Sequence, residues 1–188
     1  PPDLTAAEIS VRLGATWLPE DVIQRFMYEL LQTSGYARDR TRVHYSDRTG
    51  EWNITEKNAD RSNIHSFNTY GTQRVNAYKI IEDSLNLRDV RVFDKVYDPD
   101  GTEKRVLNKK ETAIAQAKQE IIRAKFEEWI WKDPARRERL CRIYNDRFNS
   151  VRPREYDGSH IKFVGLNPEI TLRKHQIDAI AHILYGGN

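Results

Sequence analysis

The chain has 188 residues, with 31 Lys or Arg against 28 Asp or Glu and a hydrophobic share of 38%. This length is sufficient for a folded core, and an aromatic share of 10% argues against a disordered chain. A single cysteine, Cys141, excludes an internal disulfide framework and a cysteine-based zinc site, so we expect a packing thiol there. The sequence has no apolar run of membrane-spanning length and no signal-peptide pattern at its amino terminus. Both features predict a cytoplasmic protein without a membrane partner.

The amino-terminal part predicts two helices. Thr5-Ala-Ala-Glu8 has the spacing of a capping box, which predicts the start of a short helix. Pro19, followed by two acidic residues, is typical of the first turn of a helix. Apolar residues then recur at helical spacing from Val22 to Leu31 and indicate a helix with one face in the core.

Two β-hairpins are predicted on either side of another helix. The first pairs residues 42–46 with 51–55, and the second pairs 90–97 with 102–107. Their turns are Asp47-Arg-Thr-Gly50 and Asp98-Pro-Asp-Gly101, both rich in residues that favour tight turns. In the first hairpin, Val43 and Tyr45 should share a face with Trp52 and Ile54. Between the hairpins, the polar residues 57–68 predict a loop, and a helix capped by Thr72 should end at Asn86.

The sequence from Asn108 onward predicts a helical hairpin. A long helix should run to Lys132, with these residues facing the core: Ile114, Ala117, Ile121, Ile122, Phe126, Trp129 and Ile130. Asp133-Pro134 should end it and cap the next helix. The apolar side of that second helix comprises Leu140, Ile143, Tyr144, Phe148 and Val151. We therefore predict an α+β, mainly helical fold with two short hairpins packed on helices and a long helical hairpin. Residues 1–151 should form an accessory domain, and 152–188 a connector and a further helix.

Positive charge is concentrated late in the chain. Residues 104–154 contain 15 Lys or Arg and 7 Asp or Glu, although the whole chain carries only +3. Such an asymmetry indicates a basic surface for an anion, usually nucleic acid, or a solvated helix face balanced by acidic neighbours. The candidate DNA-phosphate contacts are Arg136, Arg137, Arg139, Arg142, Arg147, Arg152 and Arg154.

The last helix is predicted between Asn167-Pro168, as cap and first turn, and the glycine pair at 186–187. Its apolar face comprises Leu172, Ala179, Ile180, Ile183 and Leu184. Gln176 lies beside that face, with Arg173 and His175 near it. A glutamine amide offers a donor and an acceptor side by side, as reading the edge of adenine requires. The alternative for Gln176 is a surface or capping role.

Leu172-Arg-Lys-His-Gln176, with the Ala179 and Ile183-Leu184 that follow, resembles the adenine-reading helix ahead of the Walker A loop in superfamily-two, Swi/Snf-like helicases. The resemblance extends to Arg12–Pro19, Tyr70–Tyr78, 108–133 and Arg152–Gly158. Together these stretches resemble the region upstream of the motor in large helicase–DNA methylase proteins of bacterial conjugative elements and phages. The resemblance implies a non-catalytic fragment that braces the motor, binds DNA and supplies Gln176, Arg173 and His175 for nucleotide binding. It also implies ATP and Mg²⁺ as cofactors of the full-length protein, and its helicase and methylase domains as partners.

Catalytic chemistry is not evident in the chain itself. The sequence contains neither a Gly-x-x-x-x-Gly-Lys-Ser/Thr loop for phosphates nor a glycine-rich methylase motif. The five histidines are dispersed, so we predict no metal site and no catalytic residue or cofactor in this fragment. The alternative to a DNA-binding accessory region is a protein-interaction module whose basic helix binds an acidic partner. A stand-alone enzyme is the third, least supported alternative.

Overall fold

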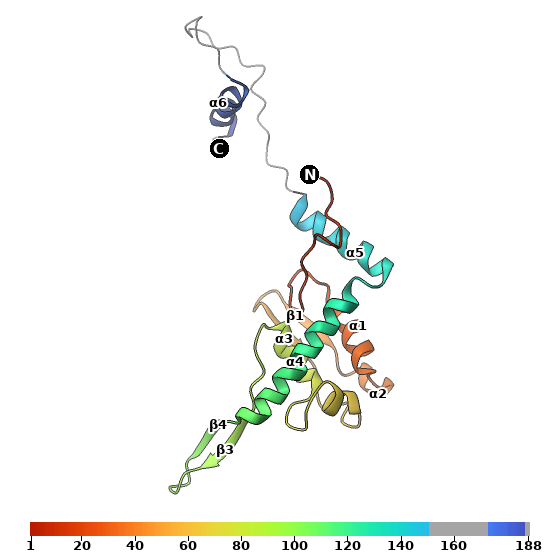
Figure 1. Ribbon diagram of the computed structural model, residues 1–188, viewed down its shortest axis with the longest axis vertical. Helices are drawn as coiled ribbons and strands as arrows, with labels where there is room; N and C mark the ends of the chain where they lie inside the picture. The colour runs from red at the N-terminus through yellow and green to blue at the C-terminus, as the bar shows by residue number, and fades with distance from the viewer. Residues whose placement is uncertain (151–172, 187–188) are drawn as a thin grey trace, which may run out of the picture. The chain divides into compact units, whose positions relative to one another are not determined.

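The computed structural model describes residues 1–150 and 173–186 (Figure 1). These residues fall into two compact units, of which the larger is Leu4–Tyr144. Its elements are α1 (Glu20–Leu31), α2 (Gly35–Arg38), β1 (Val43–Ser46), β2 (Glu51–Ile54), η1 (His65–Thr69), α3 (Ala77–Leu85), β3 (Phe93–Tyr97), β4 (Glu103–Leu107), α4 (Lys109–Ile130) and α5 (Pro134–Tyr144). The other unit contains η2 (Asn145–Asn149) and α6 (Lys174–Gly186). The predicted α+β, mainly helical class is confirmed.

The core of the larger unit is formed by α1, α3 and α4 together with the hairpin β1–β2. Phe26 of α1 and Phe126 of α4 are both buried and meet edge to face, with 5.1 Å between ring centroids. Ile81 of α3 and Ile122 of α4 are also fully buried. The apolar stripe of α1 is therefore a core contact, as its helical spacing predicts.

The first hairpin has the predicted register. Val43 pairs with Ile54, and Tyr45 pairs with Trp52. The outer edge of β1 is paired with side chains of α1: Glu20 accepts a 2.6 Å hydrogen bond from the Tyr45 N–H, and Gln24 accepts one of 3.0 Å from Val43. Because these acceptors lie four residues apart on α1, one helix face pairs with alternate residues of the strand.

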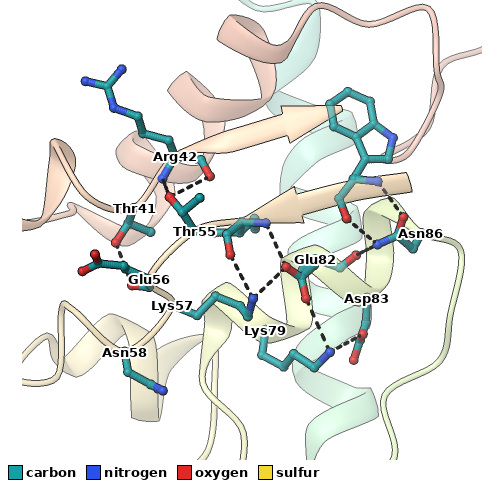
Figure 2. A network of polar contacts seen from close by, with 12 residues as sticks. Thr41, Arg42, Thr55, Glu56, Lys57, Asn58, Lys79, Glu82, Asp83 and Asn86 are labelled. Carbon is teal, nitrogen blue, oxygen red and sulfur yellow. Dashed lines mark hydrogen bonds and ion pairs between the residues drawn. The ribbon is translucent and has the colours of Figure 1, made fainter. Parts of the chain in front are cut away.

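The outer edge of β2 is paired with α3 in the same way (Figure 2). Glu82 accepts a 2.8 Å hydrogen bond from the Ile54 N–H, and Asn86 exchanges two of 2.8 Å with the backbone of Trp52. Lys57 forms a 2.8 Å ion pair with Glu82. Burial alone would raise the pKa of Glu82, but the hydrogen bonds from Ile54 and Lys57 outweigh it and lower that pKa. A two-stranded sheet is marginal by itself, and here both edges are closed by helices.

Two predicted helix starts are wrong. Thr5–Glu8 is a turn in which Glu8 accepts a 2.8 Å hydrogen bond from the Thr5 N–H, and no helix begins there. Thr72 does not cap α3: its hydroxyl accepts from the Val75 N–H in the preceding turn. The cap is Asn76, which accepts a 3.0 Å hydrogen bond from the Lys79 N–H. The predicted stop at Asn86 is confirmed.

The second hairpin is confirmed, but its first strand begins at Phe93 instead of Val90. The reason is that α4 binds the preceding backbone through polar side chains. Thr112 accepts a 3.0 Å hydrogen bond from the Val92 N–H, and Gln119 accepts one of 3.2 Å from Val90. Because they make these hydrogen bonds, Thr112 and Gln119 face the core and are buried.

The predicted orientation of α4 is consequently wrong in part. Ile122, Phe126 and Ile130 are buried as expected, but Ile114 and Ile121 are 39% and 43% exposed, and Ala117 is exposed with them. Rotating these residues inward would remove Thr112 and Gln119 from the backbone that they pair with. The long helix therefore has a second, solvent-facing apolar stripe.

The helical turn at Asp133-Pro134 is confirmed, and α5 follows it. This second helix is shorter than predicted, because the α-helix ends at Tyr144 and the π-helical turn η2 follows. Phe148, expected on the apolar side, is 51% exposed, and Val151 lies outside the described residues. None of the helices among the described residues is long and apolar enough to span a membrane.

Candidate functional site

The basic segment predicted from the charge distribution lies largely on α5. Asp133 begins this helix by accepting a 3.0 Å hydrogen bond from the Arg136 N–H. Leu140 anchors the helix in the core, and Tyr144 meets Trp17 edge to face at 5.2 Å between ring centroids. These contacts determine which arginines of α5 face solvent.

Arg136 is the exception among the candidate DNA contacts, because its side chain is buried and only 8% of the residue is exposed. Its guanidinium lies 3.4 Å from the centroid of the Trp129 ring, and Nε donates a 3.0 Å hydrogen bond to the Ile130 carbonyl. A second hydrogen bond goes to the Trp129 carbonyl. Burial lowers the pKa of Arg136. The expectation that Arg136 is exposed to DNA is wrong: it closes the end of α4, where carbonyls lack helical partners.

Arg137, Arg139 and Arg142 are exposed on α5. Arg139 forms two hydrogen bonds, of 2.6 and 3.0 Å, with the carboxylate of Asp21 on α1. The hydrogen bond from Arg139 lowers the pKa of Asp21, and the same bond raises the pKa of Arg139. Among the described residues, Arg137 and Arg142 form no ion pair. Since Arg136 is buried and Arg139 is paired with Asp21, the guanidinium groups of Arg137 and Arg142 are the ones on α5 that can bind an external anion.

The other three candidate arginines lie in the smaller unit or outside the described residues. Arg147 is exposed in η2, with its guanidinium 5.3 Å from the centroid of the Phe148 ring. Arg152 and Arg154 lie outside the described residues.

Gln176 lies in the first turn of α6, which begins at Lys174. Its Oε1 accepts a 2.9 Å hydrogen bond from the Arg173 N–H, and its own N–H bonds to the Arg173 carbonyl at 2.9 Å. This is the back-bond of a capping box, so the structure assigns Gln176 the capping role. His175 and Arg173 are exposed beside it. The predicted start at Asn167-Pro168 and the apolar position Leu172 lie outside the described residues, and Ile183 and Leu184 are exposed.

A polar hollow with a volume of about 490 Å³ is lined by side chains from the segment 57–76. The sequence did not predict it. Lys57, Arg61 and Arg74 bring positive charge to its lining, and Asp60 brings a carboxylate. Ser66 and Phe67 of η1 form part of the wall. The neighbouring Gly71 packs so closely on the start of α3 that an added Cβ would lie 2.6 Å from the Ala77 nitrogen. The Tyr70-Gly71-Thr72 sequence is the local signal for this turn.

Two of the cations lining this hollow are already engaged. Lys57 is paired with Glu82, and Arg74 forms a 2.8 Å ion pair with Asp94. Asp60, although it lines the hollow, is buried and accepts hydrogen bonds from Ser34, Asn63 and Tyr78. The hollow is therefore mainly a structural joint, and Arg61 is the lining cation that forms no ion pair among the described residues.

Comparison with known proteins places these features in a family. Residues 12–150 match the family described as a domain of unknown function, DUF8437. The chain belongs to this family. The DUF8437 region contains α1 to α5, and with them both hairpins, the polar hollow and the arginine helix, whereas α6 lies beyond it. Neither the curated proteins nor the solved structures include a match to the chain.

The acidic, cysteine and histidine side chains of this DUF8437 protein do not assemble into a metal site within the described residues. No group of three or more of them there has a suitable arrangement. Cys141 is partly buried on α5, and burial raises the pKa of its thiol. A raised pKa keeps the thiol protonated and weakly nucleophilic.

Proposed function

We propose that this DUF8437 protein is a non-catalytic DNA-contacting module, in which α5 presents Arg137 and Arg142 to the phosphate backbone. The observation that carries this proposal is the exposure of two guanidinium groups without an ion-pair partner among the described residues. Both lie on a helix whose backbone is anchored by Arg136, Leu140 and the Asp133 cap. An anchored backbone favours binding because less backbone freedom is lost on association.

The charges near these arginines determine how strong the contact can be. Arg139 is largely neutralised by Asp21, and Glu138 is an exposed carboxylate on the same helix, between Arg137 and Arg142 in the sequence. Two or three phosphate contacts give weak, sequence-independent binding that salt opposes. The DUF8437 region would then add to a stronger DNA-binding activity within a larger protein.

The resemblance to helicase–methylase proteins supports the wider proposal. In that setting the chain braces an ATP- and Mg²⁺-dependent motor, acts in the cytoplasm, and contacts the helicase and methylase domains of the same protein. Gln176 would read adenine only after its Oε1 leaves the Arg173 N–H, because this cap occupies the acceptor that adenine needs.

Replacing Arg137 and Arg142 by alanine should weaken binding to a short DNA duplex about tenfold at low salt, because two phosphate contacts are removed. Glu138→Gln should strengthen binding about twofold by removing a like charge beside the phosphates. Fluorescence anisotropy with a labelled duplex measures both effects.

The matched control for this experiment is the double variant Arg88→Ala and Arg91→Ala. Both residues are exposed between α3 and β3, and neither forms an ion pair among the described residues. The control should leave the affinity nearly unchanged. An equal loss in the control would mean that overall charge, and not α5, binds the duplex. Binding of an acidic polypeptide in preference to DNA would favour the alternative of a protein-interaction module.

A further inference from the structure

The solvent-facing side of α4 carries an apolar stripe that the core does not use. Its members recur at spacings of three and four residues: Ile114, Ala117, Ile121 and Ala124. All four are exposed, Ile114 by 39% and Ile121 by 43%. Figure 1 shows α4 as the long helix on the near side of the larger unit. This spacing keeps all four side chains on one line along the helix and is the spacing of a helix–helix seam.

A charged residue lies at each end of the stripe. Lys110 lies one turn before Ile114, and Glu128 lies one turn after Ala124. Both residues are exposed, and among the described residues the ion pair of Glu128 is a long one, of 4.0 Å, with Lys125. A stripe with a cation at its start and an anion at its end is complementary to a second copy of itself in the opposite direction.

We propose that α4 pairs with the α4 helix of a second copy of this chain in an antiparallel arrangement. In this pairing each isoleucine lies against an alanine of the partner, so every layer has the same volume and the helices stay at a constant distance. Lys110 lies opposite Glu128 of the other copy at both ends, and the helix dipoles are opposed. A parallel pair would instead place Lys110 against Lys110 and Glu128 against Glu128.

The charged side chains near the middle of α4 do not prevent this approach. Lys118 donates a 3.3 Å hydrogen bond to the Thr69 carbonyl, which draws its ammonium group toward the end of η1. Glu120 is paired with Arg123 of the same helix. The antiparallel interface is isologous, with the same patch on both copies. Four small or medium apolar side chains bury much less than the roughly 800 Å² per partner of a standard interface, so the dimer should be weak and concentration-dependent.

Sedimentation equilibrium of the 188-residue chain tests this pairing. The apparent mass should rise from 22.1 kDa toward twice that value as the concentration increases. Ile121→Glu should weaken the dimer at least about tenfold by placing a charge in the seam. Ile64→Glu is the matched control, because Ile64 is 54% exposed but lies outside α4. A mass that stays at the monomer value, or an Ile121→Glu variant that still dimerises like the wild type, would overturn the proposal.

A charge exchange tests the antiparallel direction. Lys110→Glu and Glu128→Lys should each weaken self-association about threefold, because each places like charges at both ends of the seam. An equimolar mixture of the two variants should recover wild-type association, because opposite charges again meet in the mixed dimer. A mixture that associates no better than either variant alone would exclude the antiparallel arrangement. Each variant changes an exposed side chain, and circular dichroism should show an unchanged helix content.

Discussion

Gly71→Ala should destabilise the DUF8437 region by about 3 kcal/mol, which corresponds to a fall in melting temperature of about 10 °C. Gly71 is buried between η1 and the first turn of α3. A Cβ atom at this position would overlap the Ser66 carbonyl oxygen and lie 2.6 Å from the Ala77 nitrogen. Both neighbours are backbone atoms, so no side-chain rotation relieves the overlap, and the turn must open.

The matched control for this variant is Gly35→Ala. Gly35 begins α2, and an added Cβ would meet no atom within 4 Å. Alanine there should leave the stability unchanged or raise it by about 0.5 kcal/mol, because the unfolded chain loses freedom. Thermal denaturation followed by circular dichroism measures both variants. A Gly71→Ala protein that melts with the wild type would show that the turn between η1 and α3 is not closely packed.

Asp60→Ala should destabilise the protein by about 3 kcal/mol, because it leaves buried hydrogen-bond donors without an acceptor. Asp60 is 2% exposed and accepts hydrogen bonds of 2.7 Å from Asn63 and 2.8 Å from Tyr78, with a further one from Ser34. Tyr78 is fully buried, and its hydroxyl also contacts that of Thr33 at 2.8 Å. Through these bonds Asp60 connects the loop after β2 to the start of α2 and to α3.

The same carboxylate makes stability depend on pH. Burial alone would raise the pKa of Asp60, but hydrogen bonds from Ser34, Asn63 and Tyr78 outweigh it and hold the pKa below its ordinary value. A lowered folded-state pKa means that the contribution is complete above the unfolded pKa of about 3.9 and is lost as the pH falls through the folded value. Glu82, whose pKa is also lowered, adds to the acid sensitivity.

Urea denaturation at a series of pH values measures this dependence. The wild type should lose stability below about pH 4, and Asp60→Ala should lose less over the same range. Asp39→Ala is the control, because the Asp39 side chain is 90% exposed and should add nothing measurable. Equal acid sensitivity in wild type and Asp60→Ala would show that the buried carboxylate is not the source.

Turns and strand register were predictable, because they depend on residues that are close together in the sequence. Asp98-Pro-Asp-Gly101 forms its turn with Gly101 at a φ of 85°, a conformation that favours glycine. The alternation in 42–55 fixes which side chains share a face, so the pairing of Tyr45 with Trp52 follows from the sequence. Caps were less predictable, since Thr72 and Asn76 are both good capping residues and only the backbone path selects Asn76.

The orientation of α4 was not predictable because it depends on a distant backbone. Hydrophobic periodicity favours burial of Ile114 and Ile121 over Thr112 and Gln119. The structure buries the polar pair because the extended backbone of Val90 and Val92 needs hydrogen-bond partners. Leaving those backbone groups unpaired in the core would cost more than leaving two isoleucines partly exposed.

The candidate site shows the same limit. The arginine-rich composition of α5 is visible in the sequence. The sequence does not show that Arg136 is buried while Arg137 and Arg142 are exposed to solvent. Arg136 is buried because Trp129 and the terminal carbonyls of α4 lie within its reach across the turn at Asp133. For Gln176, the spacing that suggests adenine recognition is also the spacing of a helix cap.

Salt dependence of duplex binding is the most direct test of DNA contact by α5. The affinity of the 188-residue chain for a labelled duplex should be measured by anisotropy over a series of salt concentrations. We expect binding at low salt whose log affinity falls linearly with log salt, with a slope of about −2 to −3 for two or three phosphate contacts. Absence of binding at the lowest salt concentration, or an affinity that salt does not change, would contradict the proposed function.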